Sequence, residues 1–431
     1  MNDRLKKLLD QLPFIYLLSL AFLTSIHLPI LGDKLLIPEF VFLLVFPIFF
    51  YTQKFKITKF NLIDGLLIAY LISNFISSFI SHEKSSIYES IGKLYLFLVY
   101  LLFKELAQKS TFHLNFKKYL QIFLVLLIST GLIGWILAMM GITNLFVYPY
   151  PNYPYLGTIN RLEGVTQNPT MFVSIISCFL IIYQTINYKA LIKNTIFILG
   201  SITILLTFSK SIILFFVGII FLKYNNKWIN KFIYILTFAI FFLFTNYFFT
   251  KSNNSINFEI ISNEKIFNNH NISIYKTIYL IRKELLLTNF EENLIWGLGA
   301  GNTNKELVKF QNEGKYPKSF DTNCDPVSTY FGVLAETGII GAIIILLIVY
   351  QLIKKIKYIF NKNNLLNQSI AICFIIGSIE AMNSDMLNFR HYWVLLGIMV
   401  GLLVKEQNEA CYKEKLPNDL SIRDEGKEES I

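Results

Sequence analysis

The chain has 431 residues, of which 54% are hydrophobic and only 16% are charged, and its formal net charge is +10. A soluble globular protein carries roughly 25% charged residues, so this composition excludes an ordinary soluble domain and predicts a protein solvated by lipid. Apolar stretches recur along the chain, which favours one polytopic membrane domain over residues 1–404 rather than two or three soluble domains.

A helix of about 20 apolar residues crosses the hydrocarbon core of a bilayer. By this rule we predict an all-α polytopic membrane protein with about twelve transmembrane helices. The predicted spans are 13–31, 35–51, 60–81, 87–103, 119–140, 168–187, 194–208, 211–223, 229–249, 327–350, 366–384 and 389–404. Residues 405–431 are polar and mixed in charge, which predicts a disordered cytoplasmic tail.

Lysines are concentrated in alternate loops, on the side of the amino terminus. These lysines are Lys54, Lys56, Lys59, Lys104, Lys109, Lys117, Lys118, Lys189, Lys193, Lys223, Lys227, Lys231, Lys354, Lys355 and Lys357. The positive-inside rule therefore predicts that both termini are cytoplasmic. Anionic lipids at that face account for the positive charge, so we expect no nucleic-acid partner.

The first long outer loop covers residues 141–167 and is rich in Tyr, Pro and Asn. Aromatic rings stack on the apolar faces of sugars, which makes Tyr153 and Tyr155 candidate substrate-binding residues. The alternative is an aromatic belt at the membrane interface. Arg161 lies near the end of this loop, and a cation at that depth needs a partner.

The second outer loop, residues 250–326, is the large extracytoplasmic loop between the ninth and tenth predicted spans. Its residues 272–287 have apolar side chains at helical spacing together with Lys276 and Arg282, which predicts an amphipathic surface helix. Residues 297–302 then read Gly-Leu-Gly-Ala-Gly-Asn, and glycines permit tight turns and close approach of a ligand. We expect the two outer loops to form the site together.

A third cation, Lys210, interrupts the apolar run 194–223 and separates two spans. A lysine so close to hydrocarbon is costly unless it is paired or snorkels to the interface. Arg161, Lys210 and Arg282 would together suit a pyrophosphate held at the level of the lipid headgroups.

These motifs resemble the O-antigen ligase-like superfamily, which contains O-antigen polymerases, O-antigen ligases and related exopolysaccharide polymerases. The matching elements are the segment from Arg161 to Asn168-Pro169, the pair Ser209-Lys210, the glycine-rich residues 297–302, and Ser328-Thr329-Tyr330 running into Ala335-Glu336-Thr337-Gly338. The resemblance covers roughly residues 130–350.

The resemblance implies a glycosyltransferase that polymerises polyprenyl-pyrophosphate-linked oligosaccharide units into O-antigen, capsule or a related polysaccharide at the outer face of the inner membrane. In that reaction Arg161, Lys210 and Arg282 would stabilise the departing pyrophosphate, so no metal or other cofactor is required, and Asp325 would accept the proton of the attacking hydroxyl. The candidate substrate-binding residues are Tyr153, Tyr155, Lys276, Asn302, Ser328, Tyr330 and Glu336. A chain-length regulator protein is a candidate partner.

Two positions depart from the family pattern. Val327 stands where ligases carry an essential histidine, and Lys210 stands where the family has arginine. Valine cannot take a proton, which favours a polymerase over a ligase that transfers glycan to lipid A-core. Glu336 also competes with Asp325 as the base, although a buried carboxylate bonded to neighbouring helices is the alternative. A flippase or other transporter and a non-catalytic homologue remain alternatives for the whole chain.

Overall fold

The computed structural model describes most of the chain between residues 9 and 414. The described residues are 9–23, 36–52, 60–153, 157–166, 168–209, 211–223, 286–287, 290–291, 293–314, 326, 328–362, 364–382 and 384–414. The predicted span 229–249 and the predicted surface helix 272–287 lie wholly or mostly outside them.

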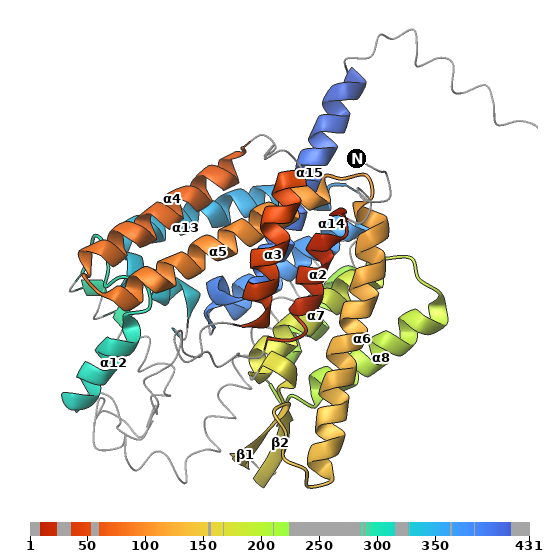
Figure 1. Ribbon diagram of the computed structural model, residues 1–431, viewed down its shortest axis with the longest axis horizontal. Helices are drawn as coiled ribbons and strands as arrows, with labels where there is room; N and C mark the ends of the chain where they lie inside the picture. Colours follow the sequence, from red (N-terminus) through yellow and green to blue (C-terminus); the bar gives the residue numbers. More distant parts are fainter. Residues whose placement is uncertain are drawn as a thin grey trace, which may run out of the picture.

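The described part of the chain is mostly helical (Figure 1). Its first half contains α2 (Leu12–Ser19), α3 (Ile37–Thr52), α4 (Leu62–Ile80), α5 (Lys84–Ala107), α6 (Phe112–Met139), α7 (Pro169–Thr185), α8 (Ala190–Leu205) and α9 (Ile212–Lys223). Its second half contains α12 (Thr303–Asn312), α13 (Thr329–Phe360), α14 (Leu365–Glu380) and α15 (Arg390–Glu414). Short 3₁₀ turns, η1 (Gly164–Thr166) and η3 (Met386–Asn388), precede α7 and α15.

Four of the described helices are long and apolar enough to cross a membrane, namely α4, α5, α6 and α13. Shorter apolar helices include α3, α7, α8, α9 and α14. The expectation of a helical membrane protein is therefore confirmed, whereas the count of twelve spans stays a prediction.

Two expectations need correction. The outer loop 141–167 contains an antiparallel hairpin of β1 (Val147–Tyr153) and β2 (Gly157–Leu162), so the fold is not purely helical. We did not predict strands here because prolines alternate with the aromatic residues, and proline lacks the N–H that normally donates a hydrogen bond to the neighbouring strand. The last helix continues to Glu414, so the beginning of the predicted disordered tail is helical.

Two pairs of helices hold one side of the molecule together. In Figure 1, α4, α5 and α13 lie side by side, and α15 packs along α5. Gly397 and Gly401 bring α15 close to α5, since a Cβ at either position would lie within 2.4 Å of the carbonyl oxygens of Tyr100 and Lys104, respectively. The wholly buried ammonium of Lys104 lies 2.6 Å from the carboxylate of Asp64, which ties α5 to α4.

The helix α13 is broken at Gly338. The backbone there has φ 63° and ψ −160°, a conformation that only glycine adopts without strain. A Cβ at Gly338 would lie 2.3 Å from the carbonyl oxygen of Ile295, which belongs to the segment before the glycine-rich residues 297–302. The break therefore admits a neighbouring segment of backbone into the helix.

We predict that Gly338→Ala destabilises the protein by about 1–3 kcal/mol, because alanine would be strained at this φ and would collide with Ile295. Gly65→Ala is the matched control, since a Cβ at Gly65, in the first turn of α4, would meet nothing within 4 Å. The control should gain up to about 1 kcal/mol. Thermal unfolding of both detergent-purified variants measures the difference, and equal midpoints would contradict the prediction.

Candidate functional site

The glycine-rich loop, residues 297–302, docks into the break in α13. The N–H of Leu298 donates to the carbonyl of Ala335 at 2.8 Å, and the N–H of Gly299 donates to the carbonyl of Glu336 at 2.9 Å. In return, the N–H of Ile339 donates to the carbonyl of Leu294 at 2.9 Å. The loop thus takes over hydrogen bonds that an unbroken helix would make within itself.

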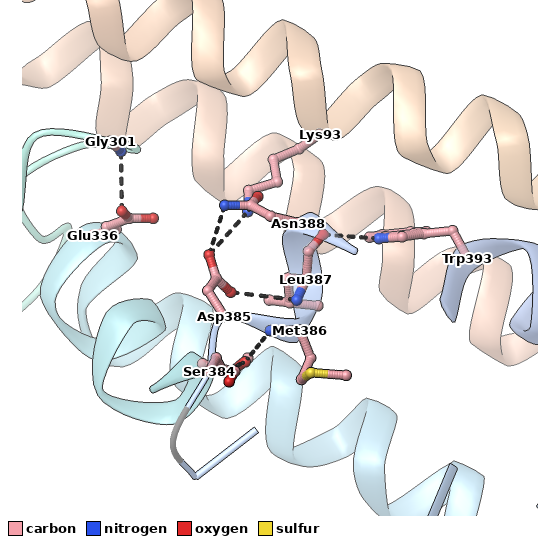
Figure 2. Close-up of polar contacts among 10 residues, drawn as sticks. Lys93, Gly301, Glu336, Ser384, Asp385, Met386, Leu387, Asn388 and Trp393 are labelled. Carbon is pink, nitrogen blue, oxygen red and sulfur yellow. Dashed lines mark hydrogen bonds and ion pairs between the residues drawn. The ribbon is translucent and has the colours of Figure 1, made fainter. Parts of the chain in front are cut away.

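Glu336 is buried where the loop and α13 meet, with a relative exposure of 7%. Its Oε1 accepts the N–H of Gly301 at 3.0 Å (Figure 2). Its carbonyl also accepts the hydroxyl of Ser77, from α4, at 2.6 Å. Glu336 is therefore a buried carboxylate bonded to the loop, and α4 contacts the same residue through the main chain.

The glycines of the loop allow close approach of the α4–α5 hairpin. A Cβ at Gly299 would lie 2.6 Å from the hydroxyl of Ser86, and a Cβ at Gly301 would lie 2.5 Å from Glu89. Asn302 is buried at the end of the loop, where its Nδ2 donates to the carbonyl of Leu298 at 2.8 Å. The loop therefore packs between α13 and the α4–α5 hairpin, and its positive-φ glycines leave room for both contacts.

A second polar group lies next to Glu336 (Figure 2). The ammonium of Lys93, from α5, donates to Oδ1 of Asn388 at 2.6 Å and lies 4.0 Å from the carboxylate of Asp385. Asp385 also accepts Nδ2 of Asn388 at 2.8 Å. Both ionisable side chains of this pair are nearly inaccessible, so their pairing compensates for their loss of hydration.

The 3₁₀ turn that carries Asp385 and Asn388 is fastened to the start of α13. Thr329 donates its N–H to the carbonyl of Ala381 at 2.9 Å and its hydroxyl to the carbonyl of Ser384 at 2.9 Å. The same hydroxyl accepts the N–H of Met386 at 2.7 Å. Hydrogen bonds therefore join the start of α13 to the connection between α14 and α15.

Arg161 lies on β2 beside the turn between α8 and α9. Its Nε donates to the carbonyl of Thr207 at 3.1 Å, and its guanidinium lies over the ring of Tyr150 at 5.3 Å from the centroid. The neighbouring N–H of Leu162 donates to the carbonyl of Leu206 at 3.0 Å. The structure thus brings the arginine-containing segment next to Leu206 and Thr207, which directly follow α8.

Glu163 follows Arg161 and is partly withdrawn from solvent. Its burial raises the pKa of the carboxyl, and the nearby positive charge of Arg161 lowers it in part. The net direction is upward, so Glu163 retains its proton at a higher pH than an exposed glutamate does.

A further buried carboxylate, Glu380, contacts the turn between α8 and α9. Its Oε1 accepts the hydroxyl of Ser211, the residue after Lys210, at 2.9 Å. The next residue, Ala381, accepts the hydroxyl of Ser328 through its carbonyl at 3.2 Å. The end of α14 therefore lies between the Ser-Lys motif and the residue that follows Val327.

A buried histidine borders the same region. Ser174 is 3.1 Å from Nε2 of His391 and 3.3 Å from the hydroxyl of Tyr392. Lys93, Glu380 and His391 were not predicted as site residues from the sequence. The available signal was the presence of ionisable residues inside apolar spans, which marks a functional candidate by default.

The structure describes only part of the predicted site. The hydroxyl of Ser328 donates to the carbonyl of Ala381, directly after α14. The hydroxyl of the half-buried Tyr330 donates to the carbonyl of Ser378 at 2.9 Å. Tyr153 ends β1, opposite Gly157. Lys210, Arg282, Asp325, Tyr155 and Lys276 lie outside the described residues.

The described site residues form two groups. Glu336, Asn302 and Lys93 belong to a group around the glycine-rich loop, whereas Arg161 and Glu380 surround the turn between α8 and α9. The two groups are linked by residues 381–388, which contact the start of α13.

Comparison with known proteins gives one family. Residues 195–346 match the family model described as O-Antigen ligase, a range that contains the α8–α9 turn, the glycine-rich loop and the break in α13. A search of curated proteins gives no match to the chain.

We predict that Lys93→Met destabilises the protein by about 3 kcal/mol, because it leaves the buried carboxylate of Asp385 without its cation. The double variant Lys93→Met/Asp385→Asn should recover part of this loss. Lys84→Met is the control, since Lys84 is exposed on the same helix. Thermal unfolding in detergent checks the series, and equal stability of the single and double variants would show that the pair is not coupled.

Proposed function

Because residues 195–346 match the family model described as O-Antigen ligase, we propose that the chain is a membrane glycosyltransferase that polymerises polyprenyl-pyrophosphate-linked oligosaccharides. Its products would be O-antigen, capsule or a related surface polysaccharide, made at the outer face of the inner membrane. The substrate is presented by the bilayer, so the enzyme needs a site at the level of the lipid headgroups.

The observation that carries this proposal is the position of Arg161. Its Nε donates to the carbonyl of Thr207, so the guanidinium lies just after the end of α8, beside a residue three positions before Lys210 in the sequence. Arg161 and Lys210 together would suit a pyrophosphate, because an arginine can donate two parallel hydrogen bonds to phosphate oxygens. Arg282 would add a third cation from the second outer loop.

In the proposed reaction, the hydroxyl oxygen of an acceptor glycan attacks the anomeric carbon of the lipid-linked donor. The new glycosidic bond forms as the bond from that carbon to the pyrophosphate oxygen breaks. Polyprenyl pyrophosphate leaves with the electron pair, and the charge that develops on it is stabilised by Arg161, Lys210 and Arg282. The proton of the acceptor hydroxyl passes to a carboxylate.

Three carboxylates compete for the role of proton acceptor. Asp325 lies two residues before Val327 and is the choice from the sequence. Glu380 is the choice from the structure, because it contacts Ser211 next to Lys210. Glu336 is the weaker choice, since it is bonded to the glycine-rich loop rather than to the turn between α8 and α9.

The substitution at Val327 favours a polymerase over a ligase. A ligase mechanism that depends on a histidine at this position has no proton acceptor in valine. The large outer loop, residues 250–326, favours a polymerase over a flippase, because the substrate site of a transporter lies between its helices near the bilayer midplane.

The proposal is tested by expressing the full chain in a strain that lacks its own polymerising enzyme and separating lipid-linked glycans by length. We expect long chains with the wild type and single repeat units with Arg161→Ala. Loss of one charge-assisted contact of about 1.5–3 kcal/mol corresponds to a rate lower by about 10- to 150-fold. Arg161→Lys should recover part of the activity, and Lys189→Ala, an exposed control, should keep all of it.

Other outcomes of the same experiment reject the proposal. Long lipid-linked chains that persist without this protein, but fail to reach lipid A-core, would identify a ligase. Precursors trapped on the cytoplasmic face would identify a flippase. Full-length polymer from Arg161→Ala would remove Arg161 from the site while leaving the polymerase assignment in place.

We predict that only one of Asp325→Asn and Glu380→Gln stops elongation, because each substitution keeps size and removes the ability to accept a proton. The rate of glycan elongation against pH, measured at equal expression, distinguishes the two. A loss below about tenfold, or 1.4 kcal/mol, removes the substituted residue as the base. If both variants retain activity, an unassisted attack on the pyrophosphate-linked sugar replaces general-base catalysis.

A further inference from the structure

A cavity of about 660 Å³ opens at the end of the helices opposite to Arg161. Arg161 lies near the start of α7 and the end of α14, whereas the cavity is bordered by the start of α6, the end of α7 and the start of α14. The cavity is therefore separated from the proposed glycan site by the length of these helices. It lies on the face that carries the lysine-rich loops and that is predicted to be cytoplasmic.

The polar lining of this cavity is basic. Lys117, Lys362 and His113 contribute to it, and among the described residues no acidic side chain lines it. The ammonium of Lys117 lies 5.2 Å from the ring centroid of Tyr188, whose hydroxyl donates to the carbonyl of Lys117. The position of this cation is thus supported by a ring and by a backbone contact.

The second lysine is positioned from a different helix. The ammonium of Lys362 lies 4.7 Å from the ring centroid of Tyr358 and 3.5 Å from the carboxylate of Glu406, on α15. Lys117 and Lys362 are both exposed, so a ligand can reach their ammonium groups, and at Lys362 an anion would share the cation with Glu406. A ligand between them would bridge α6 and the connection between α13 and α14.

Two helix amino termini border the cavity as well. Leu365 and Leu366, the first two residues of α14, line it, and Asn364 caps this helix by accepting the N–H of Asn367 at 3.3 Å. His113 belongs to the first turn of α6. The positive end of a helix dipole favours an anion, so both helices add to the field of the two lysines.

Apolar side chains complete the lining, including Phe116, Ile186 and Leu366. Apolar side chains do not contribute to the binding of a free anion. A phospholipid, by contrast, carries glycerol and acyl carbons next to its phosphate, and these carbons can pack against apolar side chains. The cavity lies at helix ends, which is the depth of the lipid headgroups in a membrane protein.

We propose that this cavity binds the phosphate headgroup of an anionic phospholipid of the cytoplasmic leaflet, with Lys117 and Lys362 as the residues that hold the phosphate. The bound lipid would join α6 to the connection between α13 and α14 on the face opposite to the glycan site. This lipid site does not depend on the proposed glycosyltransferase activity.

The test measures thermal unfolding of the full chain, purified in a neutral detergent, with phosphatidylglycerol or with phosphatidylcholine of the same acyl chains. We expect phosphatidylglycerol to raise the melting temperature by about 2 °C or more relative to phosphatidylcholine, because a ligand that binds only the folded state stabilises it. Lys117→Gln/Lys362→Gln should abolish this difference. Lys354→Gln/Lys357→Gln, which removes two exposed lysines from the same face but not from the cavity, should retain it.

Three results would overturn the proposal. One is an equal effect of the two lipids, and another is an equal loss in the control variant, which would indicate general attraction to the lysine-rich face. The third is a shift of the same size with inorganic phosphate alone, which would replace the lipid by a free anion. Native mass spectrometry of Lys362→Gln supplies a second readout, in which retained phosphatidylglycerol equal to the wild type also rejects the site.

Discussion

The break in α13 is the constraint on which the candidate site depends. Gly338 interrupts the helix, so the N–H of Ile339 pairs with Leu294, and the carbonyls of Ala335 and Glu336 pair with the glycine-rich loop instead. An unpaired backbone group inside a membrane protein is costly, so the break and the loop stabilise each other. The loop in turn brings the N–H of Gly301 to the carboxylate of Glu336.

The end of α14 connects this junction to the cationic turn. Glu380 binds Ser211, and Ala381 accepts hydrogen bonds from both Ser328 and Thr329. A displacement of the α8–α9 turn would therefore change the hydrogen bonds at the start of α13 and the position of the 3₁₀ turn that pairs with Lys93. In the proposed reaction this connection would hold the pyrophosphate-binding cations in register with the proton acceptor.

The candidate site could be predicted in part. Arg161, Lys210 and the glycine-rich residues could be proposed as site residues from the sequence, because a charged residue or a glycine cluster next to an apolar run stands out there. Of these, the structure describes Arg161 and residues 297–302. Lys93 and Asp385 were not paired in advance, since they lie nearly 300 residues apart, Lys93 in the predicted span 87–103 and Asp385 in the short loop between the predicted spans 366–384 and 389–404. Asn302 was expected to bind substrate, yet its side-chain amide caps the loop through the carbonyl of Leu298.

Hydrophobicity along the chain by itself determined that this is a helical membrane protein, because a bilayer requires apolar residues and satisfied backbone groups over each span. Apolar runs also placed most described helices within a few residues of their ends, although the hairpin of β1 and β2 was missed. Only the tertiary structure decided which polar groups meet, such as Arg161 with Thr207 and Glu336 with Gly301. The reason is that solvation by lipid is a property of each segment, whereas a hydrogen bond between segments depends on how the helices pack.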